Sequence, residues 1–127
     1  MNRYLLIDDD YIMLLIHPAI IKRVDRDALI FSSINAMKAN ELIESWMEGQ
    51  VEAPIFIFLD INMPEMNGFE FLSNMAPEMK NYLKNSKIIM LSSSIDPRDI
   101  EMAKNYSEIY DFAPKPLTME YVAKLLS

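Results

Sequence analysis

Short apolar runs alternate with amphipathic stretches along the whole chain, and this alternation restricts the possible folds more than any other feature of the sequence. Five runs have the length and composition of buried strands, and each is followed by a stretch with helical periodicity. The expected strands span residues 4–7, 28–32, 54–59, 87–91 and 110–113. Parallel neighbours need crossover connections, which helices usually supply. The alternation therefore predicts a three-layer α/β fold with helices on both faces of a parallel sheet.

The ends of the expected helices carry residues suited to cap them. Asp10, Asp96 and Thr118 each precede a helical stretch and can accept from its free backbone N–H groups. Pro97 stands at a first helical position, and Gly49 is a natural C-terminal stop. The five expected helices span residues 12–24, 35–48, 68–75, 97–105 and 119–126.

Two prolines fall inside these helical stretches. Pro18 removes a backbone donor and its ring clashes with the carbonyl of Leu14, so we expect a kink near His17 or a later start of the first helix. Pro77 interrupts the third helix, and residues 78–83 are expected to add a further turn before the fourth strand.

Composition narrows the class of protein. The length of 127 residues suits one domain, and 51% hydrophobic residues are enough for its core. No apolar run approaches the roughly 20 residues of a transmembrane helix, and no signal peptide is recognisable, so we expect a cytoplasmic protein without a membrane contact. The absence of cysteine excludes disulfides and thiolate chemistry. A net charge of −7 without a basic block argues against direct binding to nucleic acid.

Polar side chains stand at the ends of four expected strands. Asp8 and Asp9 follow the first strand, Asp60 the third, Ser92 the fourth and Lys115 the fifth. In open parallel sheets, ligands bind beyond the carboxyl ends of the strands, where such side chains meet. The sequence therefore predicts one pocket that contains three carboxylates, a hydroxyl and an ammonium group.

Three carboxylates in one pocket repel one another, and a hard divalent cation relieves that repulsion. Mg²⁺ fits such oxygen ligands best and is usually shared with a phosphate. Taken alone, the acidic cluster 8–10 is more typical of a helix N-cap, and a loop lysine is more often a solvated one. The coincidence of four strand ends that carry the required side chains favours a site for Mg²⁺ and a phosphoryl group.

The same residues resemble a known family, the receiver domain of bacterial response regulators, in a stand-alone form similar to the chemotaxis receivers. The resemblance spans essentially the whole chain and is carried by LIDDD at 6–10, LDINMPEMNG at 59–68, MLSSS at 90–94 and KPLT at 115–118. It implies a flavodoxin-like fold with strand order 2-1-3-4-5 and five helices. It also implies that residues 1–127 are a single receiver domain without an output domain.

The resemblance implies a role for each site residue. Asp60 is expected to be the phosphoacceptor, with Lys115 as the neighbouring cation. Asp9 would bind Mg²⁺ directly, Asp8 mostly through water, and Asn62 through its backbone carbonyl. The carboxylate of Asp60 would attack phosphorus in line, and the neighbouring groups would assist only through their positions and their charges.

Five further assignments follow from the resemblance. Ser92 and Phe112 match the switch positions, where a hydroxyl and an aromatic ring reorient after phosphorylation. Phe112 stands where tyrosine is frequent, and Ser93 where a smaller residue is usual. Asn62, Ser93 and Ser94 are expected to tune the rates of phosphoryl transfer and hydrolysis.

The function expected on this basis is a phosphorelay switch of a two-component system. A histidine kinase or a phosphotransfer protein would donate the phosphoryl group, and an unidentified downstream protein would bind the altered face formed by the fourth helix, the fifth strand and the fifth helix. That face could also form a homodimer. The chain would not be a conventional enzyme, although it would assist its own phosphorylation and dephosphorylation.

Two alternatives remain at this point. A phosphohydrolase of the haloacid-dehalogenase type also uses an aspartyl nucleophile and Mg²⁺, but it needs Asp-x-Asp, and Asn62 fills the second position here. A docking domain that does not depend on phosphorylation would have no use for Asp60 together with Lys115.

Other conspicuous residues are expected in the core. His17 is expected to be a core side chain away from the strand ends, without an acidic partner, and not a phosphotransfer group or ligand. Trp46 and the methionines are also expected to fill the core. The methionines in question are Met63, Met66, Met75, Met79, Met90 and Met102.

Overall fold

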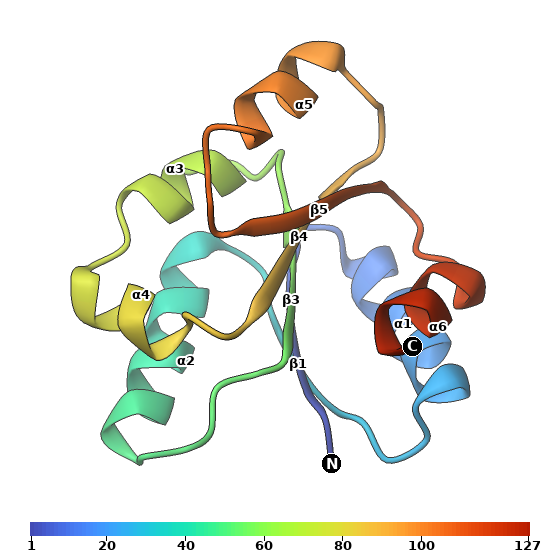
Figure 1. The fold of residues 1–127 in the computed structure, drawn as a ribbon, viewed down its shortest axis with the longest axis horizontal. Helices are drawn as coiled ribbons and strands as arrows, with labels where there is room; N and C mark the ends of the chain where they lie inside the picture. Colours follow the sequence, from blue (N-terminus) through green and yellow to red (C-terminus); the bar gives the residue numbers. More distant parts are fainter.

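The computed structural model describes residues 1–127, and a five-stranded sheet lies at its centre between two layers of helices (Figure 1). The strands are β1 (Arg3–Ile7), β2 (Leu29–Ser33), β3 (Phe56–Asp60), β4 (Lys87–Ser92) and β5 (Ile109–Pro114). Every neighbouring pair is parallel, and the order is β2-β1-β3-β4-β5. The predicted α/β fold and strand order are therefore confirmed.

Successive side chains of each strand point to opposite faces of the sheet and build two separate cores. In β1, Leu5 and Ile7 belong to the larger core, whereas Tyr4 and Leu6 belong to the smaller one. All five residues of β3 are buried, as expected for a central strand covered on both faces.

Six helices cover the sheet. They are α1 (Tyr11–Val24), α2 (Ala36–Glu48), α3 (Gly68–Ser73), α4 (Pro77–Tyr82), α5 (Pro97–Ala103) and α6 (Met119–Leu126). Helices α1 and α6 pack on one face, and α2, α3 and α4 pack on the other, with α5 beside β5 (Figure 1).

The prediction of five helices was wrong by one, because the stretch expected to form a third helix and a further turn is divided in two. Ala76 precedes Pro77 and adopts an extended conformation, with φ −64° and ψ 148°. The ring of a proline disfavours helical geometry in the preceding residue, so α3 ends before Ala76 and α4 begins at Pro77.

Helix α1 begins at Tyr11 and continues through Pro18, so the alternative of a later start was wrong. Asp10 caps this helix by accepting from the backbone N–H of Ile12 at 2.9 Å. The helix buries His17 and Ile21, and this burial offsets the backbone hydrogen bond that Pro18 removes.

Most of the residues expected in the core lie there. Trp46 is 6% exposed, and four of the six methionines are buried, with Met66 partly buried. Met102 lies on the outer side of α5 and is 46% exposed, so its expected place in the core was wrong. No helix of the structure combines the length and the apolar composition that a membrane span requires.

Candidate functional site

The register of the sheet brings two carboxylates to one edge. Ile7 lies opposite Leu59 across the β1–β3 pair, so Asp8, which follows β1, lies beside Asp60, the last residue of β3. Asp8 is 3% exposed and Asp60 is 2% exposed, whereas Asp9 reaches the solvent. Each of the three residues offers a carboxylate oxygen within 4.8 Å of the other two. The carboxylates expected at this edge thus converge.

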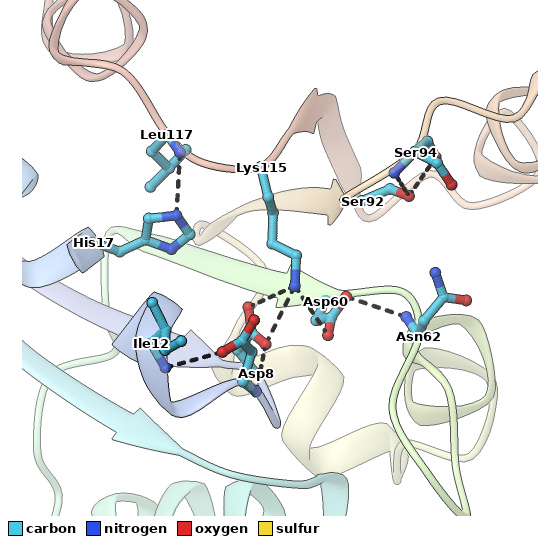
Figure 2. A network of polar contacts seen from close by, with 10 residues as sticks. Asp8, Ile12, His17, Asp60, Asn62, Ser92, Ser94, Lys115 and Leu117 are labelled. Carbon is cyan, nitrogen blue, oxygen red and sulfur yellow. Dashed lines mark hydrogen bonds and ion pairs between the residues drawn. The ribbon is translucent and has the colours of Figure 1, made fainter. Parts of the chain in front are cut away.

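Lys115 reaches the same point from the loop that follows the edge strand β5. Its backbone N–H donates to the carbonyl of Ser92 at 2.8 Å, directly after β5 ends. Its Nζ lies 3.1 Å from Oδ2 of Asp8 and 3.4 Å from Oδ2 of Asp60 (Figure 2). The ammonium group therefore bridges two buried carboxylates, and its side chain is only 9% exposed.

The electrostatics of the cluster disfavour full ionisation. Burial raises the pKa of Asp60 to about 7, and the negative charge of Asp8 adds to that shift, while Lys115 and the backbone N–H of Asn62 oppose it. Burial by itself lowers the pKa of Lys115, but the hydrogen bonds and charges of Asp8 and Asp60 together raise it. One ammonium group does not compensate three carboxylates.

This donor set suits a hard divalent cation. The three carboxylates offer only oxygen ligands and carry excess negative charge. Two of them, Asp9 and Asp60, line a pocket of about 450 Å³. The pocket is lined by Asp9, Asp10, Met13, Asp60, Asn62, Ser93, Lys115 and Pro116. A second cation beside Lys115 would lower the cost of ionising Asp60.

The hydroxyl of Ser92 does not face this pocket. It donates to the carbonyl of Ser94 at 2.6 Å and accepts from the backbone N–H of Ser94 at 3.3 Å, and Figure 2 shows it turned toward its own loop. Ser93 lines the pocket, and Ser94 is exposed. Phe112 is partly buried and packs against the larger core. Ser92, which was expected in the pocket, is therefore fully buried outside its lining, and its hydroxyl is bonded to Ser94.

Asn62 lies next to the phosphoacceptor candidate. Its backbone N–H donates to Oδ1 of Asp60 at 3.2 Å, and its exposed side chain lines the pocket. This bond holds one carboxylate oxygen of Asp60, while Lys115 lies near the other.

Sequence reasoning missed the place of His17. It is 1% exposed, and its Nε2 accepts from the backbone N–H of Leu117 at 3.1 Å, in the loop that carries Lys115 (Figure 2). The expectation that it lies away from the strand ends was wrong, although its place in the core was expected. The sequence contained a sign of this position, because His17 follows the pocket residue Met13 by four residues and therefore lies on the same face of the helix.

Comparisons with known proteins identify the family and agree with the fold. The family model of the response regulator receiver domain matches residues 4–127. The crystal structure of a two-component response regulator from Cytophaga hutchinsonii is similar with 32% identity and a TM-score of 0.86, and the match covers 99% of this chain and 94% of that one. The crystal structure of a response regulator receiver protein from Dyadobacter fermentans is similar with 26% identity, a TM-score of 0.82, and 99% and 95% coverage.

A relative of known sequence is the two-component response regulator ORR1 of Oryza sativa subsp. japonica. It is 34% identical to this chain over 91 residues, which are 72% of this chain. The matched region spans only 38% of the length of that relative.

Proposed function

This chain belongs to the response regulator receiver domains of two-component systems, and on that premise we propose that it is a switch controlled by phosphorylation of Asp60. One observation carries the proposal. Asp60 is a buried carboxylate that shares the ammonium group of Lys115 with Asp8 and lines an open pocket. Burying a carboxylate in this way at the end of a central strand costs free energy, and such a cost is typical of a functional site.

The chemistry required of Asp60 is a single displacement. A carboxylate oxygen forms a bond to phosphorus, and the bond between phosphorus and the imidazole nitrogen of a donor histidine breaks, with its electron pair remaining on that nitrogen. Lys115 can then turn from Asp8 toward the transferred phosphoryl oxygens, because its Nζ already lies 3.4 Å from Asp60. The N–H of Asn62 keeps the carboxylate oriented for attack.

Asp8, Asp9, Asp60 and the backbone carbonyl of Asn62 are the groups that would hold Mg²⁺. The ion would supply positive charge for the phosphoryl oxygens. We assign Asp9 to direct contact, because it reaches solvent and lies free of Lys115, and Asp8 to contact through water, because Lys115 already occupies both of its oxygens.

The switch itself would start at Ser92. Its hydroxyl would leave Ser94 and bond to a phosphoryl oxygen on Asp60, and Phe112 would move into the space behind it. The altered face would lie on α5, β5 and α6, which correspond to the expected fourth helix, fifth strand and fifth helix. A downstream protein or a second copy of the chain would bind there.

The residues around the pocket mouth would set the rates. Ser93 lines the pocket and would narrow the approach of a phosphodonor, while Asn62 and Ser94 would influence the water that hydrolyses the acyl phosphate. The donor would be a histidine kinase or a phosphotransfer protein, as in two-component systems generally.

Intact mass measured after incubation with acetyl phosphate and Mg²⁺ tests the proposal. We expect the wild type to gain one phosphoryl group, and the Asp60→Asn variant or a wild-type sample treated with a chelator to gain none. Turnover of many equivalents without an adduct would favour a phosphohydrolase, whose second aspartate is replaced here by Asn62. Absence of both adduct and turnover would favour a docking domain that is independent of phosphorylation.

A further inference from the structure

The only histidine of the chain forms a long-range contact that the proposed chemistry does not use. His17 lies on the buried side of α1 and is 1% exposed. Its Nε2 accepts from the backbone N–H of Leu117, a residue 100 positions later in the sequence. Because a nitrogen that accepts from an N–H carries no proton, the imidazole is neutral and its proton lies on Nδ1.

This contact lies in the short loop that presents Lys115. The backbone N–H of Lys115 donates to Ser92 on β4, and the backbone N–H of Leu117 donates to His17 on α1. Between them, Pro116 has no N–H to donate. Of the two backbone N–H groups in the segment 115–117, that of Lys115 is therefore bonded to a backbone carbonyl, and only that of Leu117 is bonded to a side chain.

We propose that His17 is a positioning residue for Lys115, because it holds the loop at Leu117 and so fixes the point from which the ammonium group reaches Asp8 and Asp60. The contribution of His17 to phosphorylation rests on the proposed role of Asp60 as phosphoacceptor. The placement of Lys115 by His17 does not depend on that role.

The surroundings of His17 favour the neutral form that this contact needs. Burial lowers the pKa of His17, and Lys115 lowers it further, against the raising effect of Asp8 and Asp10. Leu117 is itself 3% exposed, so its N–H has no access to bulk water if the imidazole is removed. A buried donor without a partner is unfavourable, and the loop is expected to shift until the N–H is satisfied.

Two substitutions separate the hydrogen bond from the volume of the side chain. His17→Gln retains an acceptor at about the distance of Nε2 from the backbone, whereas His17→Met has similar length and no suitable acceptor. Ile21→Val is the matched control, because Ile21 is fully buried one turn further along α1 and its side chain forms no hydrogen bond. If His17→Met does not fold, His17→Leu serves the same purpose.

The first measurement is the rate of phosphorylation by acetyl phosphate with Mg²⁺, for variants whose folding is checked by circular dichroism. We expect His17→Met to be slower by about tenfold or more, since small errors in the position of a charged group are costly. His17→Gln and Ile21→Val should stay within about threefold of the wild type. Equal rates for His17→Met and the wild type, or equal losses for Met and Gln, would overturn the proposal.

The second measurement is independent of phosphorylation. In ¹⁵N NMR spectra of the wild type, we expect His17 as the Nδ1–H tautomer, a protected Leu117 amide, and a slowly exchanging Lys115 ammonium signal. His17→Met should lose the last two features, and His17→Gln should keep them. If they depend on His17 while the wild type accepts no phosphoryl group, the proposed function alone is wrong. If they persist in His17→Met, the positioning role is wrong.

Discussion

Asp60 is buried next to a second carboxylate, and its charged form is therefore disfavoured in the folded chain. Burial is the main cause of the upward shift of its pKa to about 7, and Asp8 is the next. In the unfolded chain the carboxyl group has its ordinary pKa near 3.8. The folded state thus binds a proton more tightly than the unfolded state between these two values.

Without a divalent cation, the free energy of unfolding should fall as pH rises from about 4 to about 7, because the folded state has to give up a proton that the unfolded state has already lost. Asp60→Asn removes this cost. We expect the variant to be more stable than the wild type in a chelating buffer, with a larger difference at about pH 8 than at about pH 5.

Urea unfolding of both proteins at the two pH values measures this effect. Asp9→Asn is a suitable comparison, because Asp9 reaches solvent and its charge is far less costly. A destabilised Asp60→Asn variant, or a difference in the free energy of unfolding that is the same at both pH values, would contradict the raised pKa of Asp60.

At the scale of secondary-structure elements, the junction of β3 and α3 depends on a glycine. A Cβ atom on Gly68 would lie 2.8 Å from the carbonyl oxygen of Asp60 and 2.9 Å from the Cε atom of Met90. The N–H of Gly68 also donates to the carbonyl of Ile61 at 2.9 Å. The start of α3 can approach the end of β3 this closely only because Gly68 has no side chain.

Gly68→Ala is therefore expected to lower the free energy of unfolding by about 1–3 kcal/mol, as overpacking generally does. Gly49→Ala is the matched control. Gly49 ends α2 with φ −81°, and the nearest atom to its added Cβ would be the Ser45 carbonyl oxygen at 3.3 Å, so its effect should stay below about 1 kcal/mol. Chemical denaturation of both variants tests this, and similar losses would show that the approach to Asp60 is not the cause.

At the scale of the whole molecule, the proposed switch connects the pocket to the face formed by α5, β5 and α6. The α5, β5 and α6 elements and the loop that precedes α5 expose four large apolar side chains, and Ser92 is bonded to Ser94 at the start of that loop. These side chains belong to Ile95, Met102, Tyr110 and Met119. A hydroxyl that leaves this loop for the phosphoryl group would change the path of the chain into α5.

Phosphorylation should therefore shift the amide resonances of α5, β5 and α6 in the wild type. In Ser92→Ala, Asp60 and Lys115 are unchanged, so the adduct should still form, while the shifts should stay near the pocket. Two-dimensional NMR with acetyl phosphate and Mg²⁺ measures both. If the shifts spread equally in Ser92→Ala, the hydroxyl of Ser92 does not transmit the signal.

Features that depend on neighbouring residues were predictable from the sequence. The five apolar runs became the five strands, because their composition and length favour buried extended chain regardless of distant partners. Asp10, Asp96 and Thr118 cap their helices, and Gly49 ends α2, because capping is a contact over two to four residues. The polar strand ends then had to meet at one edge once the sheet was parallel.

Contacts and orientations that depend on packing were decided only by the tertiary structure. Local pattern could not show that His17 reaches Leu117, that Lys115 bridges Asp8 and Asp60, or that the hydroxyl of Ser92 turns to its own loop. The periodicity of a sequence determines the face on which a side chain lies. The rotamer and the partner of that side chain depend on which atoms from distant segments are within reach, and only the folded chain brings those segments together.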